Sequence, residues 1–209
     1  MTPEEKIAWL DARKRGVSGT DVAALMGLNP YKKEADVLMD KLGRGKEFVG
    51  NAATRAGNKL EPIVADLYSS RFQRILTPGE FLRHPENDRH LGTPDFLHPF
   101  GGLEIKTGAE KTFKNGCPTY YETQSRWYMY LTDRDEWDLY GLIVPKDRSE
   151  IPEYSYEWVS LQPVREFRFQ RDQAFERRML DAADRFLEKW DRIQRGEVSG
   201  VLGSQLPWR

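Results

Sequence analysis

The stretch HLGTPDFLHPFGGLEIKT, residues 90–107, carries the strongest indication of the fold in this sequence. It is typical of two strands joined by a tight Pro-Phe-Gly-Gly turn, with Asp95 at the end of the first strand. Glu104 and Lys106 are two residues apart in the second strand, so their side chains point to one face of the sheet, while Ile105 points into the core. The turn brings Asp95 beside them. We therefore expect two carboxylates and an ammonium group to meet next to an apolar floor.

Outside this hairpin, the spacing of apolar residues predicts helices before it and both helices and strands after it. A short helix is expected to begin at Thr20, as its N-cap, and to stop at Gly27 in the left-handed conformation. Other helices are expected over residues 3–14, 34–42, 53–71, 118–132 and 164–194, and other strands over residues 80–85, 136–145 and 153–163. This order predicts an α/β (α+β) fold, in which helices flank a central mixed β-sheet.

The composition predicts a soluble globular protein, because 39% of the 209 residues are hydrophobic and 31% are charged. We expect a single domain over residues 1–209. No apolar run approaches the ~20 residues that span a bilayer, and one cysteine, Cys117, favours a reducing, cytosolic compartment. The net charge of -1 does not by itself indicate nucleic-acid binding. If DNA is bound, a local basic surface holds it, and not the electrostatic potential of the whole protein.

Phosphodiester hydrolysis needs the grouping that the hairpin is expected to form. Carboxylates such as Asp95 and Glu104 hold Mg²⁺ or Mn²⁺, and the Ile105 backbone carbonyl offers a further ligand. Lys106 can orient the attacking water and offset developing charge, and Glu61, on the preceding long helix, can add another carboxylate. The alternative is an ordinary surface salt bridge between Glu104 and Lys106. The apolar strands around the motif favour a functional site, because charged side chains are seldom buried unless they have a functional role.

Five sequence elements also follow one another in a fixed order. They are Arg13-Lys-Arg-Gly-Val-Ser-Gly-Thr20-Asp21-Val22, Gly57-Asn-Lys-Leu-Glu61, Thr93-Pro94-Asp95, Glu104-Ile105-Lys106 and Tyr120-Tyr121-Glu-Thr-Gln124. Together they resemble the lambda exonuclease family of phage recombination nucleases, the viral recombinase group, within the PD-(D/E)XK nuclease superfamily. The resemblance covers most of the chain, from Trp9 to about Pro145, and is only architectural beyond it. It implies a restriction-endonuclease-like core.

The resemblance also implies an activity and a set of roles. The activity is 5′-to-3′ digestion of one strand of linear double-stranded DNA to mononucleotides, which leaves a 3′ single-stranded tail. The metal ligands would be Asp95, Glu104 and the Ile105 carbonyl, holding two Mg²⁺ ions that Mn²⁺ can replace. Lys106 would be the catalytic lysine and Glu61 a further acidic member. The pocket for the 5′-phosphate would consist of three side chains, Arg13, Thr20 and Gln124.

For assembly and partners, the resemblance implies a ring-shaped homotrimer around DNA and a single-strand annealing recombinase that takes the 3′ tail, in the cytoplasm of a bacterial host cell. Two other functions stay open, a restriction-type endonuclease on the same core and a catalytically inert DNA-binding module. One departure from the family pattern is Phe96, which stands where a Gly often follows the Asp. We assign no role to Arg126, and we expect the aromatic residues over 120–130 to form a core face plus a subunit contact.

Overall fold

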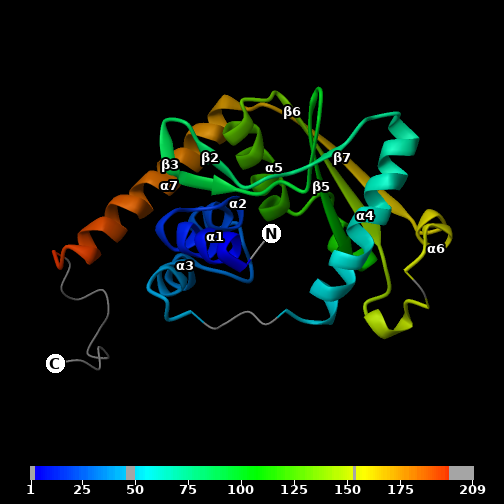
Figure 1. Ribbon diagram of the computed structural model, residues 1–209, viewed down its shortest axis with the longest axis horizontal. Helices are drawn as coiled ribbons and strands as arrows, with labels where there is room; N and C mark the ends of the chain where they lie inside the picture. The colour runs from blue at the N-terminus through cyan, green and yellow to red at the C-terminus, as the bar shows by residue number, and fades with distance from the viewer. Residues whose placement is uncertain (1–2, 46–49, 153, 198–209) are drawn as a thin grey trace.

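A five-stranded mixed sheet forms the centre of the computed structural model, which describes residues 3–45, 50–152 and 154–197 (Figure 1). Its strands lie in the order β1 (Thr77–Pro78), β4 (Phe96–His98), β5 (Gly101–Gly108), β6 (Glu136–Ile143) and β7 (Val164–Gln170). β5 and β6 run parallel, and the other neighbours run antiparallel. A separate two-stranded sheet pairs β2 (Leu82–His84) with β3 (Asn87–Gly92). The predicted mixed sheet flanked by helices is confirmed.

Helices cover both faces of the sheet. They are α1 (Pro3–Arg15), α2 (Gly19–Leu25), α3 (Glu34–Lys41), α4 (Ala52–Phe72), α5 (Thr119–Thr132), α6 (Tyr156–Ser160) and α7 (Gln173–Gln194), with short 3₁₀ turns over Glu110–Thr112 and Arg148–Glu150. One core lies between α4 and the sheet, where Leu60 and Val64 pack with Ile105. A second core joins α2, α5 and α7 to the other face, with Trp127 and Trp137 fully buried. β5, which carries the motif, is therefore sandwiched between two apolar layers.

The chain from residue 154 to 194 differs from its prediction. The strand predicted over residues 153–163 is wrong for residues 154–163, because Ser155 caps a short helix, α6, by accepting the N–H of Trp158 at 3.2 Å. Residue 153 lies outside the described residues. The last strand comes afterwards, as β7, and the final helix begins only at Gln173. Polar and apolar side chains alternate over residues 166–170, which is the period of a strand and not of a helix. Asp172 then starts α7 by accepting two backbone N–H groups.

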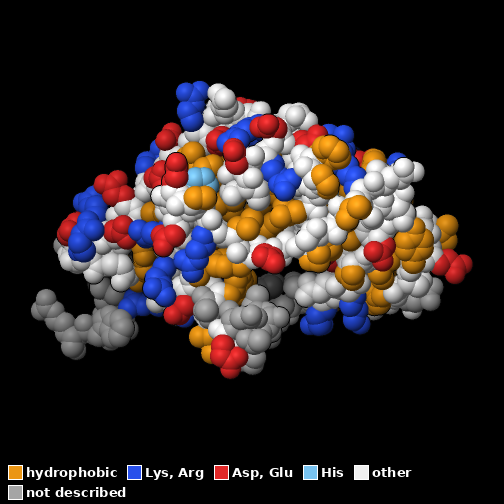
Figure 2. Space-filling view, turned by 45° about the horizontal axis from the view of Figure 1, so that its top comes forward, with side chains coloured by type: hydrophobic (Ala, Val, Ile, Leu, Met, Phe, Trp, Pro, Cys, Tyr) orange, Lys and Arg blue, Asp and Glu red, His pale blue; other side chains and the backbone are white. Residues whose placement is uncertain are grey.

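Two smaller predictions are also corrected. The helix predicted over residues 3–14 is expected to carry Trp9 and Leu10 inward, but Leu10 is 44% exposed, because α1 covers the core with another face, on which Ala12 is buried. Asp95 does not end a strand; it lies in the connection that leads into β4. On the face drawn in Figure 2, basic side chains are interspersed with acidic ones, as the near-zero net charge predicts. Among the described residues, no helix combines the length and apolar character that crossing a bilayer requires.

Candidate active site

The β4–β5 hairpin leaves part of a sheet edge open. β4 pairs only with Gly101 to Leu103, the first three residues of β5, whereas β6 pairs with β5 over its whole length. Beyond β4, the backbone N–H of Ile105 has no strand to donate to on that side. The side chain of Asp95 takes this place, because its Oδ2 accepts the Ile105 N–H at 2.7 Å. The short strand thus positions a carboxylate directly beside the motif on β5.

Glu104 and Lys106 lie side by side on one face of β5, as predicted. Lys106 Nζ donates a hydrogen bond to Glu104 Oε1, while Ile105 is buried on the other face in the core under α4. Glu104 is 0% exposed, and its second oxygen, Oε2, has no hydrogen-bond partner among the described residues. Buried polar atoms in folded proteins are nearly always paired. This unpaired oxygen therefore marks a place where the fold alone does not satisfy the side chain.

Glu61 brings a third carboxylate from α4. The helix starts at Asn51, whose side chain accepts the N–H of Thr54 at 3.0 Å, and Leu60 fixes it against the sheet. Burial, and then the charge of Asp95, raises the pKa of Glu61 to about 7. Burial, followed by the same neighbour, raises the pKa of Glu104 to about 8. The three carboxyl groups therefore disfavour one another's charge.

One ammonium group faces these three carboxyl groups. Burial lowers the pKa of Lys106, but attraction to Glu104 and Asp95 outweighs burial and keeps that pKa above its ordinary value. Lys106 is therefore a cation at neutral pH. Its Nζ also lies 5.3 Å from the centre of the Tyr121 ring, which holds the amine on its remaining side. The site carries more potential negative charge than its one lysine can balance.

A divalent cation fits this excess of carboxylate. The free Oε2 of Glu104 is a hard oxygen donor, and a cation would relieve its repulsion with Asp95 and Glu61. In the part of the chain that the structure describes, no three side chains of His, Cys, Asp or Glu already form a metal-binding group. One oxygen of Glu104 is engaged by Lys106, and one of Asp95 by a backbone N–H. The remaining oxygens of these side chains are the ones that could hold an ion.

The predicted phosphate-binding residues are brought together in a second pocket. Arg13, Thr20 and Gln124 come from α1, α2 and α5 and line one cavity of about 210 Å³. The guanidinium carbon of Arg13 lies 4.7 Å from the ring centre of Trp9, which also lines the cavity. Stacking of this kind orients a guanidinium while leaving its N–H groups available.

Tyr128 joins this pocket to the carboxylates, and the sequence did not single it out for this role. Gln124 Nε2 donates to Tyr128 Oη, and Tyr128 Oη donates to the Thr93 carbonyl, both at 2.9 Å. Thr93 stands two residues before Asp95. Burial, and then the charge of Glu104, raises the pKa of Tyr128 far above its ordinary range, so it stays a hydrogen-bond donor. The only signal in the sequence is the four-residue spacing of Gln124 and Tyr128 on one helix face.

The start of α2 differs from its prediction. Its N-cap is Ser18 in an extended conformation, not Thr20, because Asp21 forms a capping box by accepting the backbone N–H of Ser18 at 3.2 Å. Thr20 is instead exposed in the first turn and lines the pocket with Arg13. The hydroxyl group keeps its predicted location, but it does not cap the helix. The predicted stop at Gly27 is confirmed by its φ of 72°.

A buried ion network holds the elements around this pocket. Asp21 accepts Lys41 Nζ at 2.8 Å and Lys32 Nζ at 2.9 Å. Lys41 Nζ also donates to the carbonyl of Arg13 at 2.7 Å, which ties α3 to the last turn of α1. The sequence shows Asp21 as a first-turn residue, but its lysine partners lie 11 and 20 positions away. No local pattern reveals such a contact.

Other polar residues near the site have structural contacts. Arg126 pairs with Glu122 at 2.8 Å and lies over two phenylalanine rings. His98 contacts Arg74 at 2.8 Å, and the buried His90 contacts Tyr130 Oη at 3.0 Å. These contacts explain the positions of the three side chains without a direct part in the site.

The fold is that of solved exonuclease structures. LHK-Exo, crystallised in complex with dAMP, superposes with a TM-score of 0.70 at 22% identity, over 92% of this chain and 100% of that one. A second structure of this alkaline exonuclease, from Laribacter hongkongensis, gives 0.66 at 23% identity, over 91% and 97%. A phage related exonuclease from Haemophilus somnus 129PT gives 0.62 at 20% identity, over 88% and 96%. At these identities the likeness establishes a shared fold.

The chain belongs to the YqaJ-like viral recombinase domain family, whose model matches residues 8–135. The resemblance that the motifs indicated is therefore confirmed. The chain is 31% identical over 151 residues to the uncharacterized protein R354 of Acanthamoeba polyphaga mimivirus, covering 62% of this chain and 27% of that protein. It is 32% identical over 129 residues to the uncharacterized protein YqaJ of Bacillus subtilis (strain 168), covering 58% and 40%. Protein D345L of African swine fever virus (strain Badajoz 1971 Vero-adapted) matches at 28% over 150 residues, covering 56% and 43%. The chain thus matches less than half the length of each of these relatives.

Proposed function

We propose that this chain is a metal-dependent 5′-to-3′ exonuclease. It digests one strand of linear double-stranded DNA to mononucleotides and leaves a 3′ single-stranded tail. The observation that carries this proposal is the pairing of two adjacent sites, a buried carboxylate cluster with an unpaired oxygen and a separate pocket that contains Arg13. The names of the structural neighbours, and the mononucleotide dAMP bound to LHK-Exo, support the same activity.

The carboxylate cluster performs the hydrolysis in this proposal. Asp95, Glu104 and Glu61 hold divalent cations, two Mg²⁺ ions that Mn²⁺ can replace, with the Ile105 carbonyl as a further ligand. When bound, such ions polarise the phosphoryl oxygen and lower the pKa of water. Lys106 donates a hydrogen bond to the attacking water and offsets the negative charge that develops on the phosphate. The high pKa of Lys106 keeps the charge that this role needs.

The second pocket selects the strand end. Arg13 can bind a terminal phosphate with two N–H groups, and Thr20 and Gln124, from two other helices, offer a hydroxyl and an amide in the same pocket. A phosphate anchored there fixes which phosphodiester reaches the carboxylates, because the Tyr128 bridge sets the spacing between the two sites. This anchoring favours an exonuclease over a restriction-type endonuclease. The intact carboxylates and lysine favour an enzyme over an inert DNA-binding module.

Assembly and partners follow from the same proposal. The chain acts as a ring-shaped trimer around duplex DNA, so that enclosure compensates for a net charge of only -1. The 3′ tail passes to a single-strand annealing recombinase in the cytoplasm of the infected bacterial cell. Membership of a viral recombinase domain family supports this recombination role.

The test is digestion of linear duplex DNA with and without a 5′-phosphate, in Mg²⁺ and in EDTA. We expect loss of one strand that depends on Mg²⁺, is stimulated by the 5′-phosphate and is abolished by Lys106→Ala. The exposed Lys114 provides a matched control, because Lys114→Ala should retain activity. Arg13→Ala should lose mainly the preference for phosphorylated ends. Cutting of a closed circular duplex would favour the endonuclease, and no digestion by the parent in any metal would overturn the proposal.

A further inference from the structure

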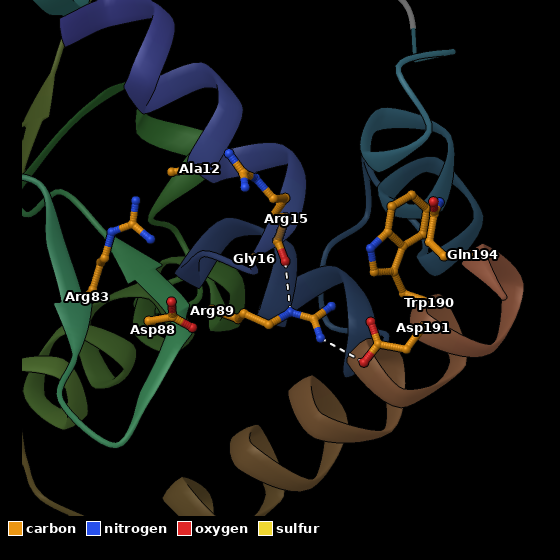
Figure 3. Close-up of a pocket in the computed structure, with 9 residues that line it drawn as sticks. All are labelled: Ala12, Arg15, Gly16, Arg83, Asp88, Arg89, Trp190, Asp191 and Gln194. Carbon is orange, nitrogen blue, oxygen red and sulfur yellow. Dashed lines mark hydrogen bonds and ion pairs between the residues drawn. The ribbon is translucent and has the colours of Figure 1, made fainter.

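A cavity of about 500 Å³ lies outside both sites, between α1, the β2–β3 hairpin and α7 (Figure 3). Three arginines line it, Arg15, Arg83 and Arg89, together with the carboxylates of Asp88 and Asp191. Figure 3 shows that Arg15 enters from α1 and Arg83 from β2, on two sides of the same space. The charges lining the cavity are thus positive in sum.

The three arginines differ in what they are free to bind. Arg89 is engaged, because its Nη1 pairs with Asp191 at 2.8 Å and its Nε donates to the Arg15 carbonyl at 2.9 Å. The side chain of Arg15 is 77% exposed, and it approaches the exposed Asp11 only to 3.6 Å. Arg83 pairs with no carboxylate within the described residues, and its guanidinium carbon lies 5.5 Å from the ring centre of Phe81. Arg15 and Arg83 are therefore available for an anionic ligand.

Two of the residues that line this cavity closely precede, along the chain, residues of the two sites already described. Along one run of the chain, Asp88 and Arg89 line this cavity, Leu91 to Thr93 line the phosphate pocket, and Asp95 reaches the carboxylate cluster. In an extended strand, Arg89 and Leu91 are about 7 Å apart. Phe81, beside Arg83, also lines the phosphate pocket. The cavity therefore adjoins that pocket on the side away from the carboxylates.

We propose that Arg15 and Arg83 bind a backbone phosphate of an unpaired 5′ extension of the digested strand. This inference rests on the proposed function. A blunt strand ends in the phosphate pocket, so that the cavity stays without DNA. A strand that continues beyond the pocket places its next phosphate toward Arg15 and Arg83. Water then adds across the usual phosphodiester, leaving a 5′-phosphate on the remaining strand and a 3′-hydroxyl on a released piece that is longer by the extension.

Binding measured by fluorescence anisotropy tests the site directly. The Lys106→Ala protein, which should not cut, is titrated with a blunt duplex and with a duplex carrying a short 5′ extension. We expect the extension to strengthen binding and the added changes Arg15→Ala and Arg83→Ala to remove that gain. Loss of one single-strand phosphate contact should also reduce the slope of log K against log salt by about 0.7. Binding of the blunt duplex should not change, and Arg177→Ala, an exposed change on α7 outside the cavity, should behave as the parent.

Product analysis on otherwise unchanged protein separates this inference from the proposed function. Parent protein should release a short oligonucleotide from the extended end, and the Arg15→Ala, Arg83→Ala variant should release much less of it. Both proteins should digest a blunt, phosphorylated duplex equally. If blunt duplex is digested but the variant treats extended ends as the parent does, the cavity has another ligand, such as an acidic protein segment, and this inference fails alone. If the parent digests no duplex, the proposed function fails.

Discussion

Asp21 and Glu104 are both buried carboxylates, and they differ in the number of cations that face them. Asp21 accepts two lysines, Lys32 and Lys41, which outweigh the effect of burial and hold the pKa of Asp21 below its ordinary value. Glu104 shares one lysine with Asp95, and the pKa of Glu104 rises to about 8. The first arrangement stabilises the fold by charge balance. The second leaves an excess of negative charge, which a bound divalent cation would balance.

We expect the largest effect, on the rate of DNA digestion, when a carboxylate is removed from the cluster around Glu104. Glu104→Gln keeps the shape of the side chain but removes a carboxylate that the proposal makes a metal ligand. The rate of DNA digestion should therefore fall roughly 10³-fold or more. The folded state should not suffer, because the amide also removes repulsion with Asp95 and Glu61. We expect the melting temperature in EDTA to be equal to or above that of the parent. Steady-state digestion and thermal unfolding on the same preparation check both parts.

The melting temperatures of Glu104→Gln and of the parent should also depend differently on pH. A raised folded-state pKa means that Glu104 contributes stability that is fully present below its ordinary value of 4.5 and is lost as the pH rises through about 8. The gap in metal-free melting temperature between Glu104→Gln and the parent should therefore grow from about pH 5 to about pH 9. Added Mg²⁺ should narrow the gap by stabilising the parent. A gap that shrinks toward high pH would show that Glu104 is balanced after all.

We expect the next largest effect, on stability, when the carboxylate of Asp21 is removed from its network with two lysines. Asp21→Asn leaves two lysines beside a neutral amide, one of them nearly buried, and should cost about 3–5 kcal/mol of unfolding free energy. Because Lys41 also holds the Arg13 carbonyl, the variant should lose part of its preference for 5′-phosphorylated ends. Chemical denaturation and competition between the two kinds of end measure these changes.

A matched pair of controls makes this test specific. Asp36→Asn, at an exposed position on α3, should cost far less stability. Adding Lys41→Met to Asp21→Asn removes one of the uncompensated charges and should recover part of the lost stability. Equal losses for Asp21→Asn and Asp36→Asn would mean that burial of the charge network has no energetic weight. The stability that Asp21 contributes should also disappear in acid, below its ordinary pKa of 3.8.

Glu104 and Asp21 also differ in how far the sequence predicts the groups around them. The unbalanced site lies within one hairpin plus one helix, so the two-residue spacing of Glu104 and Lys106 and the period of α4, together with the ordered motifs of the family, predict which groups meet there. The balanced network depends on Lys32 and Lys41, whose approach to Asp21 is set by how α2 and α3 pack. Charged residues without a fixed spacing give no local signal. The sequence therefore predicts the candidate catalytic groups but not the groups that hold the pocket lined by Arg13.

The same distinction applies to the fold. The long elements α4, α5 and β6 follow from periodicity and lie within about two residues of their predicted bounds. The segment over 154–163 was misassigned because alternating aromatic residues imitate a half-buried strand. In a short helix such as α6, the cap at Ser155 decides the conformation, and the sheet instead recruits Val164–Gln170 beside β6. Pairing with a distant strand is a tertiary effect that local alternation cannot reveal.

The smallest expected effect tests the junction of the two regions. Ser18 caps α2, and its hydroxyl donates to Asp21 Oδ2 at 3.1 Å while its side chain lines the pocket with Arg13. Ser18→Ala should cost about 1 kcal/mol of stability, as other lost N-caps do, and should leave the rate on 5′-hydroxyl ends unchanged. Ser18→Thr should restore the stability, since it keeps the hydroxyl. If Ser18→Ala instead lowered the rate on every end as much as Glu104→Gln does, the pocket and the carboxylate cluster would be one site, and the contrast between a balanced scaffold and an unbalanced centre would not hold.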